Sequence, residues 1–374
     1  MIDLKKFIDG LHTEGVKFIT GVPDTLLNDF CLYVADKWPQ ELHVIAANEG
    51  NAVALAAGYY ISSSSVPLVY MQNSGLGNTV NPILSLTDKD VYAIPMVLLI
   101  GWRGDPAIKD HAQHRKQGQL TPVLLDTMDI PYKILEYDTN DTLDKLKWAV
   151  NTTKEINSAV ALIVKKGILE KGEKEGFKGE GIELLSREEA IKCVIESVPE
   201  NALFVASTGR ATRELYELRN LSGKGHERDF LNVGAMGHTS SIALGLSIGL
   251  KNCLVVCLEG DSSAIMHLGA LTTIGKVKPA KFLHILLNNG VHESVGGQPS
   301  AGFSADLTAI AENSGYNTVG SAVKTATDLQ QSIKILLEKK GPCFIEIFIK
   351  KGIRSDLPPL KFNLKNSKEN FMKI

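Results

Sequence analysis

The sequence lacks several features that would assign it to a particular class of protein. Its 5 cysteines form no pairwise zinc-binding pattern, and its 40 basic residues are balanced by 42 acidic ones. That balance leaves no broad positive field for nucleic acid or for a membrane surface. No apolar run reaches the roughly 18 residues that a membrane-spanning helix needs. We therefore expect neither nucleic acid nor a membrane as a partner.

The N-terminal segment also lacks the apolar centre of a secretion signal. The stretch MIDLKKFIDGLHTEG has the spacing of an amphipathic helix instead. Together with the absence of a disulfide pattern, this predicts a protein of the reducing cytoplasm. Cys253 and Cys257 lie four apart (257 − 253) on a predicted strand, and we interpret them as small buried hydrophobes rather than redox or metal-binding groups.

What the chain does have is a pattern that occurs twice. In both halves a helix and a strand are followed by an Ala-rich helix with two glycines, and later strands end in polar loops. The offset between matching positions is 188 from Thr20 to Thr208, 187 from Gly50 to Gly237, 188 from Asn73 to Asp261 and 185 from Lys165 to Lys350. Self-similarity at half the chain length predicts two copies of one α/β domain, each a parallel sheet with helices on both faces.

The composition also suggests where these domains begin and end. We expect the first domain over residues 1–166 and the second over residues 182–351. The stretch between them, residues 167–181, is rich in glycine and charge, as linkers are. The basic segment 352–374 contains Pro358-Pro359, and we interpret it as a C-terminal tail on the surface rather than a third domain.

Two polar loops in the second half follow apolar strands. Asp261 comes shortly after the predicted strand 254–258, and Asn288 follows the predicted strand 282–287, with a predicted helix over 264–274 between them. Parallel strands joined by a helix place both carboxyl ends at the same edge of a sheet. A carboxylate and an amide oxygen there are suitable ligands for Mg²⁺, which usually also binds substrate phosphates. The pattern therefore predicts a metal-bridged diphosphate.

The spacing of these two loops resembles the metal motif of the thiamine-diphosphate-dependent decarboxylases. Asp261 and Asn288 are 27 positions apart (288 − 261), and the resemblance implies that they bind Mg²⁺ together with the backbone carbonyl of Gly290. Ser262 and Ser263 stand where the family usually has glycine first. Each loop taken alone could be an ordinary helix cap or turn, but the joint spacing favours the metal motif.

The same resemblance implies the rest of a cofactor site. Glu49, at the start of a predicted helix, matches the glutamate that hydrogen-bonds the aminopyrimidine ring; its alternative role is a favourable charge at the helix N-terminus. Met236 matches the residue that bends the cofactor, although a methionine is also common core filler. The predicted cofactor-binding residues are Glu49, Asn73, Thr208, Gly234, Met236, His238, Asp261, Ser262, Ser263 and Asn288. Since the two domain types of the family contribute to one site between subunits, the resemblance implies a homodimer at minimum.

Two segments of the first half carry a narrower resemblance. YMQNSGLGNTVNPILSL and IPMVLLIGWRGDPAIKDHAQHRKQG are similar to segments of the phosphonopyruvate decarboxylases, and the sulfopyruvate decarboxylases share much of the first. The resemblance implies that Asp24 assists protonation as a second catalytic residue beside Glu49. Asp24 could equally be the turn former after Pro23. The predicted substrate-binding residues are Asp24, Ser74, Arg103 and His114, where His114 donates when it is protonated.

These features lead to one preferred function and three alternatives. The preferred function is decarboxylation of 3-phosphonopyruvate to phosphonoacetaldehyde and CO₂ in phosphonate biosynthesis, with thiamine diphosphate and Mg²⁺. The first alternative is decarboxylation of sulfopyruvate or another small anionic 2-oxo acid. A carboligase of the same fold is the second. The third is a noncatalytic cofactor-binding subunit.

Overall fold

The computed structural model describes residues 1–170 and 184–374, which separate into two compact units. One unit contains most of the first half of the chain together with residues 295–298, and the other contains the rest of the second half. The predicted linker falls mostly outside the described residues. No helix in the described part of the chain has both the length and the apolar character needed to cross a membrane.

The first unit is built on a six-stranded parallel sheet in the order β2-β1-β3-β4-β6-β5. Its strands are β1 (Ile19–Gly21), β2 (His43–Ile45), β3 (Leu68–Gln72), β4 (Met96–Gly101), β5 (Tyr132–Leu135) and β6 (Ala159–Val164). Its helices are α1 (Leu4–Thr13), α2 (Asn28–Lys37), α3 (Glu49–Ser63), α4 (Leu76–Leu86), α5 (Ala112–Thr127) and α6 (Thr139–Ile156).

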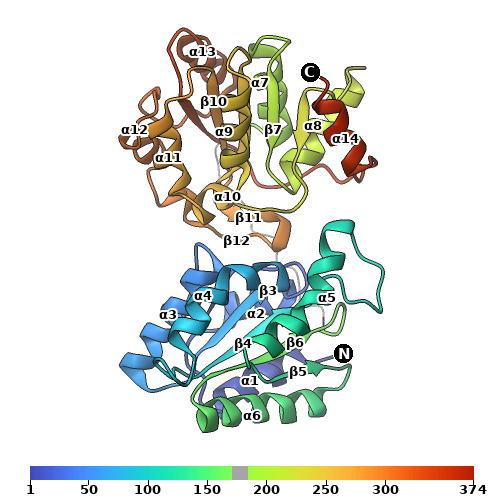
Figure 1. Ribbon diagram of the computed structural model, residues 1–374, viewed down its shortest axis with the longest axis vertical. Helices are drawn as coiled ribbons and strands as arrows, with labels where there is room; N and C mark the ends of the chain where they lie inside the picture. Colours follow the sequence, from blue (N-terminus) through green and yellow to red (C-terminus); the bar gives the residue numbers. More distant parts are fainter. Residues whose placement is uncertain (171–183) are drawn as a thin grey trace. The chain divides into compact units, whose positions relative to one another are not determined.

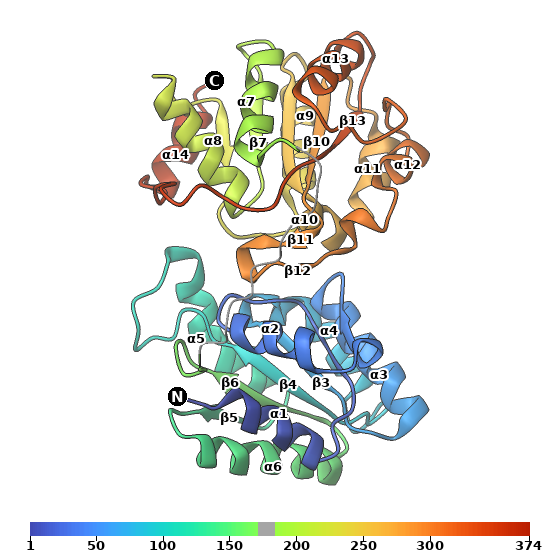
Figure 2. The same cartoon turned by 180° about the vertical axis from the view of Figure 1, so that it is seen from behind.

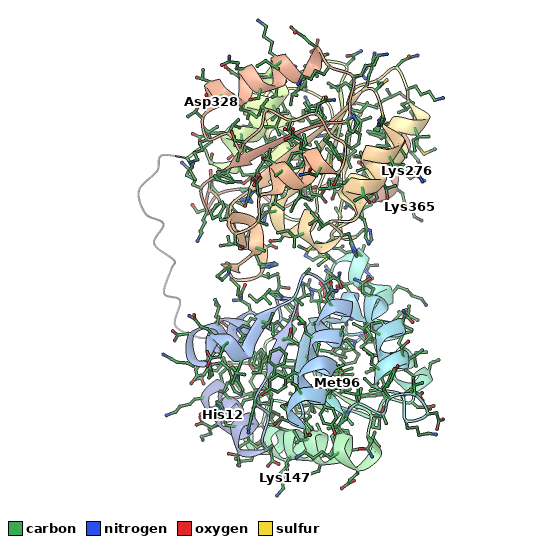
Figure 3. All side chains as sticks on the ribbon, turned by 90° about the vertical axis from the view of Figure 1, so that its left-hand side faces the viewer. His12, Met96, Lys147, Lys276, Asp328 and Lys365 are labelled. Carbon is green, nitrogen blue, oxygen red and sulfur yellow. The ribbon has the colours of Figure 1, made fainter. Side chains whose placement is uncertain are left out.

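Helices cover both faces of this sheet, because successive strand residues point to opposite sides. Leu68 and Tyr70 of β3 pack with α1, α2 and α6, whereas Val69 and Met71 pack with α3, α4 and α5. Figure 1 and Figure 2 show these helices on the two sides of the strands. Met96 lies in the interior of this unit in Figure 3 and is fully buried.

The second unit has a five-stranded parallel sheet in the order β13-β10-β9-β7-β8. Its strands are β7 (Leu203–Ala206), β8 (Asp229–Leu231), β9 (Val255–Gly260), β10 (Phe282–Asn288) and β13 (Cys343–Phe348), and β11 (Val291–His292) pairs with β12 (Gln298–Pro299). Its helices are α7 (Arg187–Ser197), α8 (Arg210–Leu221), α9 (Thr239–Gly249), α10 (Asp261–Met266), α11 (Ala270–Val277), α12 (Leu307–Asn313), α13 (Ala326–Leu337) and α14 (Leu364–Phe371). Helices α7, α8 and α13 pack on one face, and α9 to α12 pack on the other.

The two sheets have the same core topology. Read from the other edge, the second sheet is β8-β7-β9-β10-β13, which matches β2-β1-β3-β4-β6 of the first, so only β5 has no counterpart. This confirms the predicted pair of homologous α/β domains. It also puts β3 and β9, and likewise β4 and β10, in equivalent places.

Two local features differ from the sequence predictions. The single helix predicted over 264–274 is two helices, because His267 leaves the helical conformation and lies with Met266 against Gly237. The segment after residue 352 is more than a surface arm. It ends in α14, which packs near β8 with Phe371 buried.

Candidate active site

Asp261 and Asn288 lie at the ends of the neighbouring strands β9 and β10. Asp261 begins α10 directly after β9, and Asn288 is the last residue of β10, so the parallel register of the strands brings them to the same edge. A Cβ atom at Gly302 would be 2.4 Å from Asn288 Oδ1 and 2.5 Å from Asp261 Oδ2. Both oxygens therefore point to one place, as the spacing predicted.

The surroundings of Asp261 suit a cation. Its side chain is 2% exposed, and burial raises the pKa of its carboxyl group to about 6, against the opposing effect of hydrogen bonds from Ser300 and backbone amides. The main influences on that pKa are burial and these hydrogen bonds, and none of them comes from a cationic side chain. A carboxylate oxygen and an amide oxygen that converge without a positive partner are the donor set that Mg²⁺ prefers. The residues present thus fit the predicted metal.

The segment 300–302 covers these two oxygens. The Ser300 hydroxyl donates to Asp261 Oδ2, and the Ser300 amide donates to the carbonyl of Gly290 at 2.9 Å. Gly290 has a φ of +67° and donates its own amide to Asn288 Oδ1 at 3.0 Å. The predicted third ligand therefore lies beside the other two, with its carbonyl in contact with Ser300. No motif in the sequence marks this cover.

A buried carboxylate that the sequence analysis missed lies behind Asn288. Asn288 Nδ2 donates to Glu346 Oε1 and to the Gly302 carbonyl, both at 2.7 Å. Glu346 Oε2 accepts from the amide of Thr308 at 3.2 Å and from its hydroxyl at 2.8 Å. A glutamate inside the apolar strand CFIEIF was the one signal that could have drawn attention to it.

Most polar side chains among the predicted cofactor-binding residues of the second unit already have partners within the protein. Thr208 Oγ1 accepts from the Gly234 amide at 2.9 Å. Ser263 Oγ donates to Glu259 at 2.8 Å and accepts from the Gly237 amide at 3.2 Å. The Ser263 hydroxyl therefore already donates its proton to Glu259. Only the backbone N–H of Ser263 could donate to a diphosphate. Ser262 Oγ makes a long contact of 3.4 Å with the carbonyl of Val291, and the ring of His238 stacks on His267 at 4.4 Å.

Met236 lies in a loop with unusual backbone conformation. Gly234, Ala235 and Gly237 have φ values of +87°, +44° and +83°. Ala235 adopts a conformation that costs a residue with a Cβ about 1–2 kcal/mol. Met236 is half-buried between them. Such a loop holds its methionine in a defined place, which is compatible with the predicted wedge but does not require it.

Glu49 occupies the first turn of α3 in the other unit. Asn48 caps this helix by accepting from the Asn51 amide at 2.9 Å. The Glu49 side chain is 6% exposed and accepts from Asn78 Nδ2 at 2.8 Å. A Cβ atom at Gly75 would be 2.2 Å from its Oε1, so only glycine fits against this carboxylate. The site that holds Glu49 is therefore built by α4 as well as α3.

Asp24 is fully buried beside two polar side chains of the β3 end. Gln72 Nε2 donates to its Oδ1, and Ser74 Oγ donates to Gln72 Oε1 at 2.7 Å. Burial raises the pKa of Asp24, and its Oδ2 has no hydrogen-bond partner among the described residues. Asp24, Gln72 and Ser74 therefore form one hydrogen-bonded row, of which sequence analysis had singled out the first and the last.

Arg103, a predicted substrate contact, forms an ion pair within the protein. Its guanidinium donates to Asp110 from Nε at 2.8 Å and from Nη2 at 2.6 Å, and Nη1 donates to Thr25 at 3.0 Å. This contact holds the pKa of Asp110 below its usual range. Asp110, seven residues along the chain, thus binds the guanidinium group that is predicted to bind the substrate anion.

Asn73 makes internal hydrogen bonds, and His114 has a lowered pKa. Asn73 donates to the Arg103 carbonyl at 2.8 Å and to Thr121 at 2.9 Å, and accepts from the Arg103 amide at 3.0 Å, so its amide group clasps the loop after β4. Burial, followed by the nearby Arg103 charge, lowers the pKa of His114 to about 4. His114 is therefore uncharged near neutrality, and a contact between its protonated ring and the substrate stays a prediction.

Comparisons with known proteins agree with this two-part arrangement. Residues 208–347 match the family model of the thiamine pyrophosphate enzyme C-terminal TPP binding domain, and residues 5–127 match that of the N-terminal TPP binding domain. The phosphonopyruvate decarboxylase of Streptomyces viridochromogenes is 31% identical, over 94% of this chain and 89% of its own length.

Two further relatives have similar coverage. The phosphonopyruvate decarboxylase of Streptomyces hygroscopicus is 31% identical over 94% of this chain and 88% of its own length. The sulfopyruvate decarboxylase of Methanosarcina acetivorans is 24% identical over 93% and 91%. In each case the similarity extends through both units.

Proposed function

This chain belongs to the thiamine pyrophosphate enzymes, with thiamine diphosphate as its cofactor, and we propose that it decarboxylates 3-phosphonopyruvate to phosphonoacetaldehyde and CO₂. The observation that carries the proposal is the 31% identity to two phosphonopyruvate decarboxylases, maintained over 94% of the chain. The single-chain sulfopyruvate decarboxylase has 24% identity over a similar length. We infer that the reaction serves phosphonate biosynthesis in the cytoplasm.

In this reaction the bond between the carboxylate carbon and the carbonyl carbon breaks, CO₂ leaves, and a proton takes its place. Thiamine diphosphate, when bound, supplies the nucleophilic carbon and accepts the electron pair that CO₂ leaves behind. The task of the protein is then to bind, orient and move protons. We assign Glu49 to a hydrogen bond with the aminopyrimidine ring, since its carboxylate is buried, fixed by Asn78 and confined by Gly75.

Asp261, Asn288 and the Gly290 carbonyl would hold Mg²⁺, whose positive charge would offset the negative charge of the diphosphate. The convergence of the first two oxygens on one place supports this assignment. Because Asp261 is the one charged group of the three, it would supply most of the attraction for the cation. The fixed loop that includes Gly234, Met236 and His238 would then contact the cofactor, with Met236 as the wedge.

We assign protonation and substrate contact to the row formed by Asp24, Gln72 and Ser74. A buried carboxyl group with a raised pKa holds its proton more strongly than an exposed aspartate, so it can give one to the product carbon. Arg103 would have to release Asp110 before its fork could take a phosphonate. Binding of the substrate anion would therefore compete with an internal ion pair.

Steady-state kinetics with 3-phosphonopyruvate, sulfopyruvate and pyruvate test the substrate. We expect kcat/KM for 3-phosphonopyruvate to exceed that for pyruvate by about 10²-fold or more, because pyruvate lacks the second anionic group and cannot make the contacts that the phosphonate would make in the transition state. A higher value for sulfopyruvate would move the chain to that activity. Carbon–carbon bond formation with an added aldehyde would indicate a carboligase. Turnover that needs a second gene product would indicate a noncatalytic subunit.

We also propose that the smallest active unit is a homodimer. The warrant is that the Glu49 half and the Asp261 half match different domain models of a family whose cofactor site combines both types. Mass photometry of the active enzyme would give twice the 40.6 kDa chain mass, or a multiple of it. Full activity of a monodisperse monomer would contradict this.

A further inference from the structure

We propose that Glu346 is a positioning residue for the metal, because it fixes which atom of Asn288 faces the cation; this rests on the metal site proposed above. An asparagine amide has an oxygen that accepts and a nitrogen that donates, and the two ends have nearly the same shape. An unheld Asn288 could therefore present either end to Asp261. Only the oxygen can bind a cation.

The contacts of Glu346 remove this ambiguity. A carboxylate accepts hydrogen bonds and cannot donate, so Oε1, 2.7 Å from the Asn288 amide, requires the nitrogen of Asn288 at that position. The Gly302 carbonyl, also an acceptor at 2.7 Å, imposes the same orientation from another side. Asn288 Oδ1 is then directed to the place where Asp261 Oδ2 also points.

Glu346 is itself held on its other oxygen. Thr308, at the start of α12, donates to Oε2 through both its amide and its hydroxyl. Glu346 is 3% exposed, so these bonds replace the water that the carboxylate has lost. Hydrogen bonds from Thr308 to Glu346 and from Asn288 to Glu346 therefore connect α12 to the proposed metal ligand.

The test is a titration of Mg²⁺ in the presence of thiamine diphosphate, followed by calorimetry, for Glu346→Gln, Glu346→Ala and the wild type. We expect the Mg²⁺ dissociation constant to rise about 10- to 100-fold in Glu346→Ala, the usual effect of removing such a partner, and less in Glu346→Gln. Turnover should recover to within about threefold of the wild type once Mg²⁺ is saturating, since the chemical groups are intact.

Three further variants make the outcome decisive. Thr308→Val should shift the Mg²⁺ titration in the same direction by a smaller factor. Asp229→Asn removes an equally buried carboxylate, paired with Arg219 at the opposite edge of the same sheet, and should lower stability without changing the Mg²⁺ affinity. Unchanged affinity in both Glu346 variants, with loss of binding in Asp261→Ala, would overturn the positioning role. Unchanged affinity in Asp261→Ala as well would refute the metal site itself.

A different observation carries a second inference: we infer that Cys257, Glu259 and His284 form a site for a divalent transition metal such as Zn²⁺. One thiol, one carboxylate and one imidazole atom lie within 4.8 Å of one another, and all three residues are fully buried. Cys257 and Glu259 share a face of β9, and His284 lies opposite Cys257 on β10. Sulfur, oxygen and nitrogen ligands of these kinds are those that Zn²⁺ takes.

The geometry between these groups favours shared ligation over a simple ion pair. His284 Nε2 and Glu259 Oε2 are 3.1 Å apart, yet neither atom has a partner in hydrogen-bonding geometry among the described residues, and His284 Nδ1 also has none. Two ligands about 2.0 Å from one tetrahedral ion would lie about 3.3 Å apart. A thiolate, a carboxylate and a divalent ion sum to zero charge, which suits a buried site; the thiol proton leaves to solvent on binding.

Metal analysis of protein purified without a metal column tests this site separately from Mg²⁺. We expect about one Zn²⁺ per chain, and a sulfur-to-metal charge-transfer band after exchange with Co²⁺. Cys257→Ser should abolish the band, and Cys343→Ser, a buried cysteine on β13, should keep it, as should Asp261→Ala. Absence of both metal and band from the folded wild type would overturn the inference and leave a Glu259–His284 pair. A band that survives in Cys257→Ser would also refute it.

Discussion

The two units share a strand order but close the same sheet edge in different ways. In the first, Asn73 after β3 binds the backbone of Arg103 after β4 through both ends of its amide. In the second, Asp261 after β9 and Asn288 at the end of β10 turn their oxygens toward one point. The first clasp is complete within the protein, whereas no cationic side chain is among the main influences on Asp261 in the second. The same two strand ends thus carry a structural clasp in the first unit and the proposed cation site in the second.

Asp261→Ala should have the largest effect on this comparison. It removes the charged ligand from the second clasp, so Mg²⁺-dependent binding of thiamine diphosphate should be lost while the fold persists, because no core volume is deleted. Calorimetry with and without Mg²⁺, beside a thermal melt, measures both. Tight Mg²⁺-dependent binding of thiamine diphosphate by the variant would show that Asp261 is not needed for the metal site.

Glu49→Gln should lower turnover by about 10²- to 10⁴-fold, the usual scale for a positioned proton-transfer group. The amide keeps the size of the side chain and its place against Gly75, so cofactor binding should remain. Exchange of the thiazolium C2 proton, followed by NMR, separates the two effects. If that exchange has the wild-type rate in the variant, Glu49 has no role in proton transfer and is only a favourable charge at the N-terminus of α3.

Asn73→Asp places a carboxylate after β3, in the position equivalent to Asp261 after β9. The variant tests whether a carboxylate at this position is sufficient for a metal site. The Arg103 carbonyl would lose its donor and face a like-signed group, which should destabilise the fold by about 1–3 kcal/mol. No Mg²⁺ site should appear, since the loop after β4 offers a backbone amide where β10 offers an amide oxygen. Urea unfolding with and without Mg²⁺ tests both parts; stabilisation by Mg²⁺ would contradict the comparison.

His114→Gln should have the smallest effect. The pKa of His114 is about 4 in the folded state and is near 6.5 when unfolded, so the unfolded chain binds more protons between these values. Stability should therefore fall as the pH falls from about 6.5 to 4, and the variant should lose part of that dependence. Kinetics at neutral pH should change by less than about threefold. A large loss near pH 7 would show that His114 contacts the substrate.

The sequence was informative where function depends on spacing along the chain. The repeat, the parallel sheets and the convergence of Asp261 with Asn288 follow from strands that end at one edge. Glu346 and Ser300 could not be predicted, because they meet these ligands across 58 and 39 positions of intervening chain. For Arg103 the sequence indicates the cation but not its ion pair, although the partner, Asp110, lies only seven positions away.

The most direct test of the account is the titration of cofactor-depleted protein with thiamine diphosphate at zero and saturating Mg²⁺. The converging oxygens of Asp261 and Asn288 predict tight binding with Mg²⁺ present and a loss of affinity of about 10²-fold or more without it, because the diphosphate then meets an uncompensated carboxylate. Equal affinity at both Mg²⁺ concentrations would contradict the account, since Asp261 and Asn288 would then not bind a cation that holds the diphosphate.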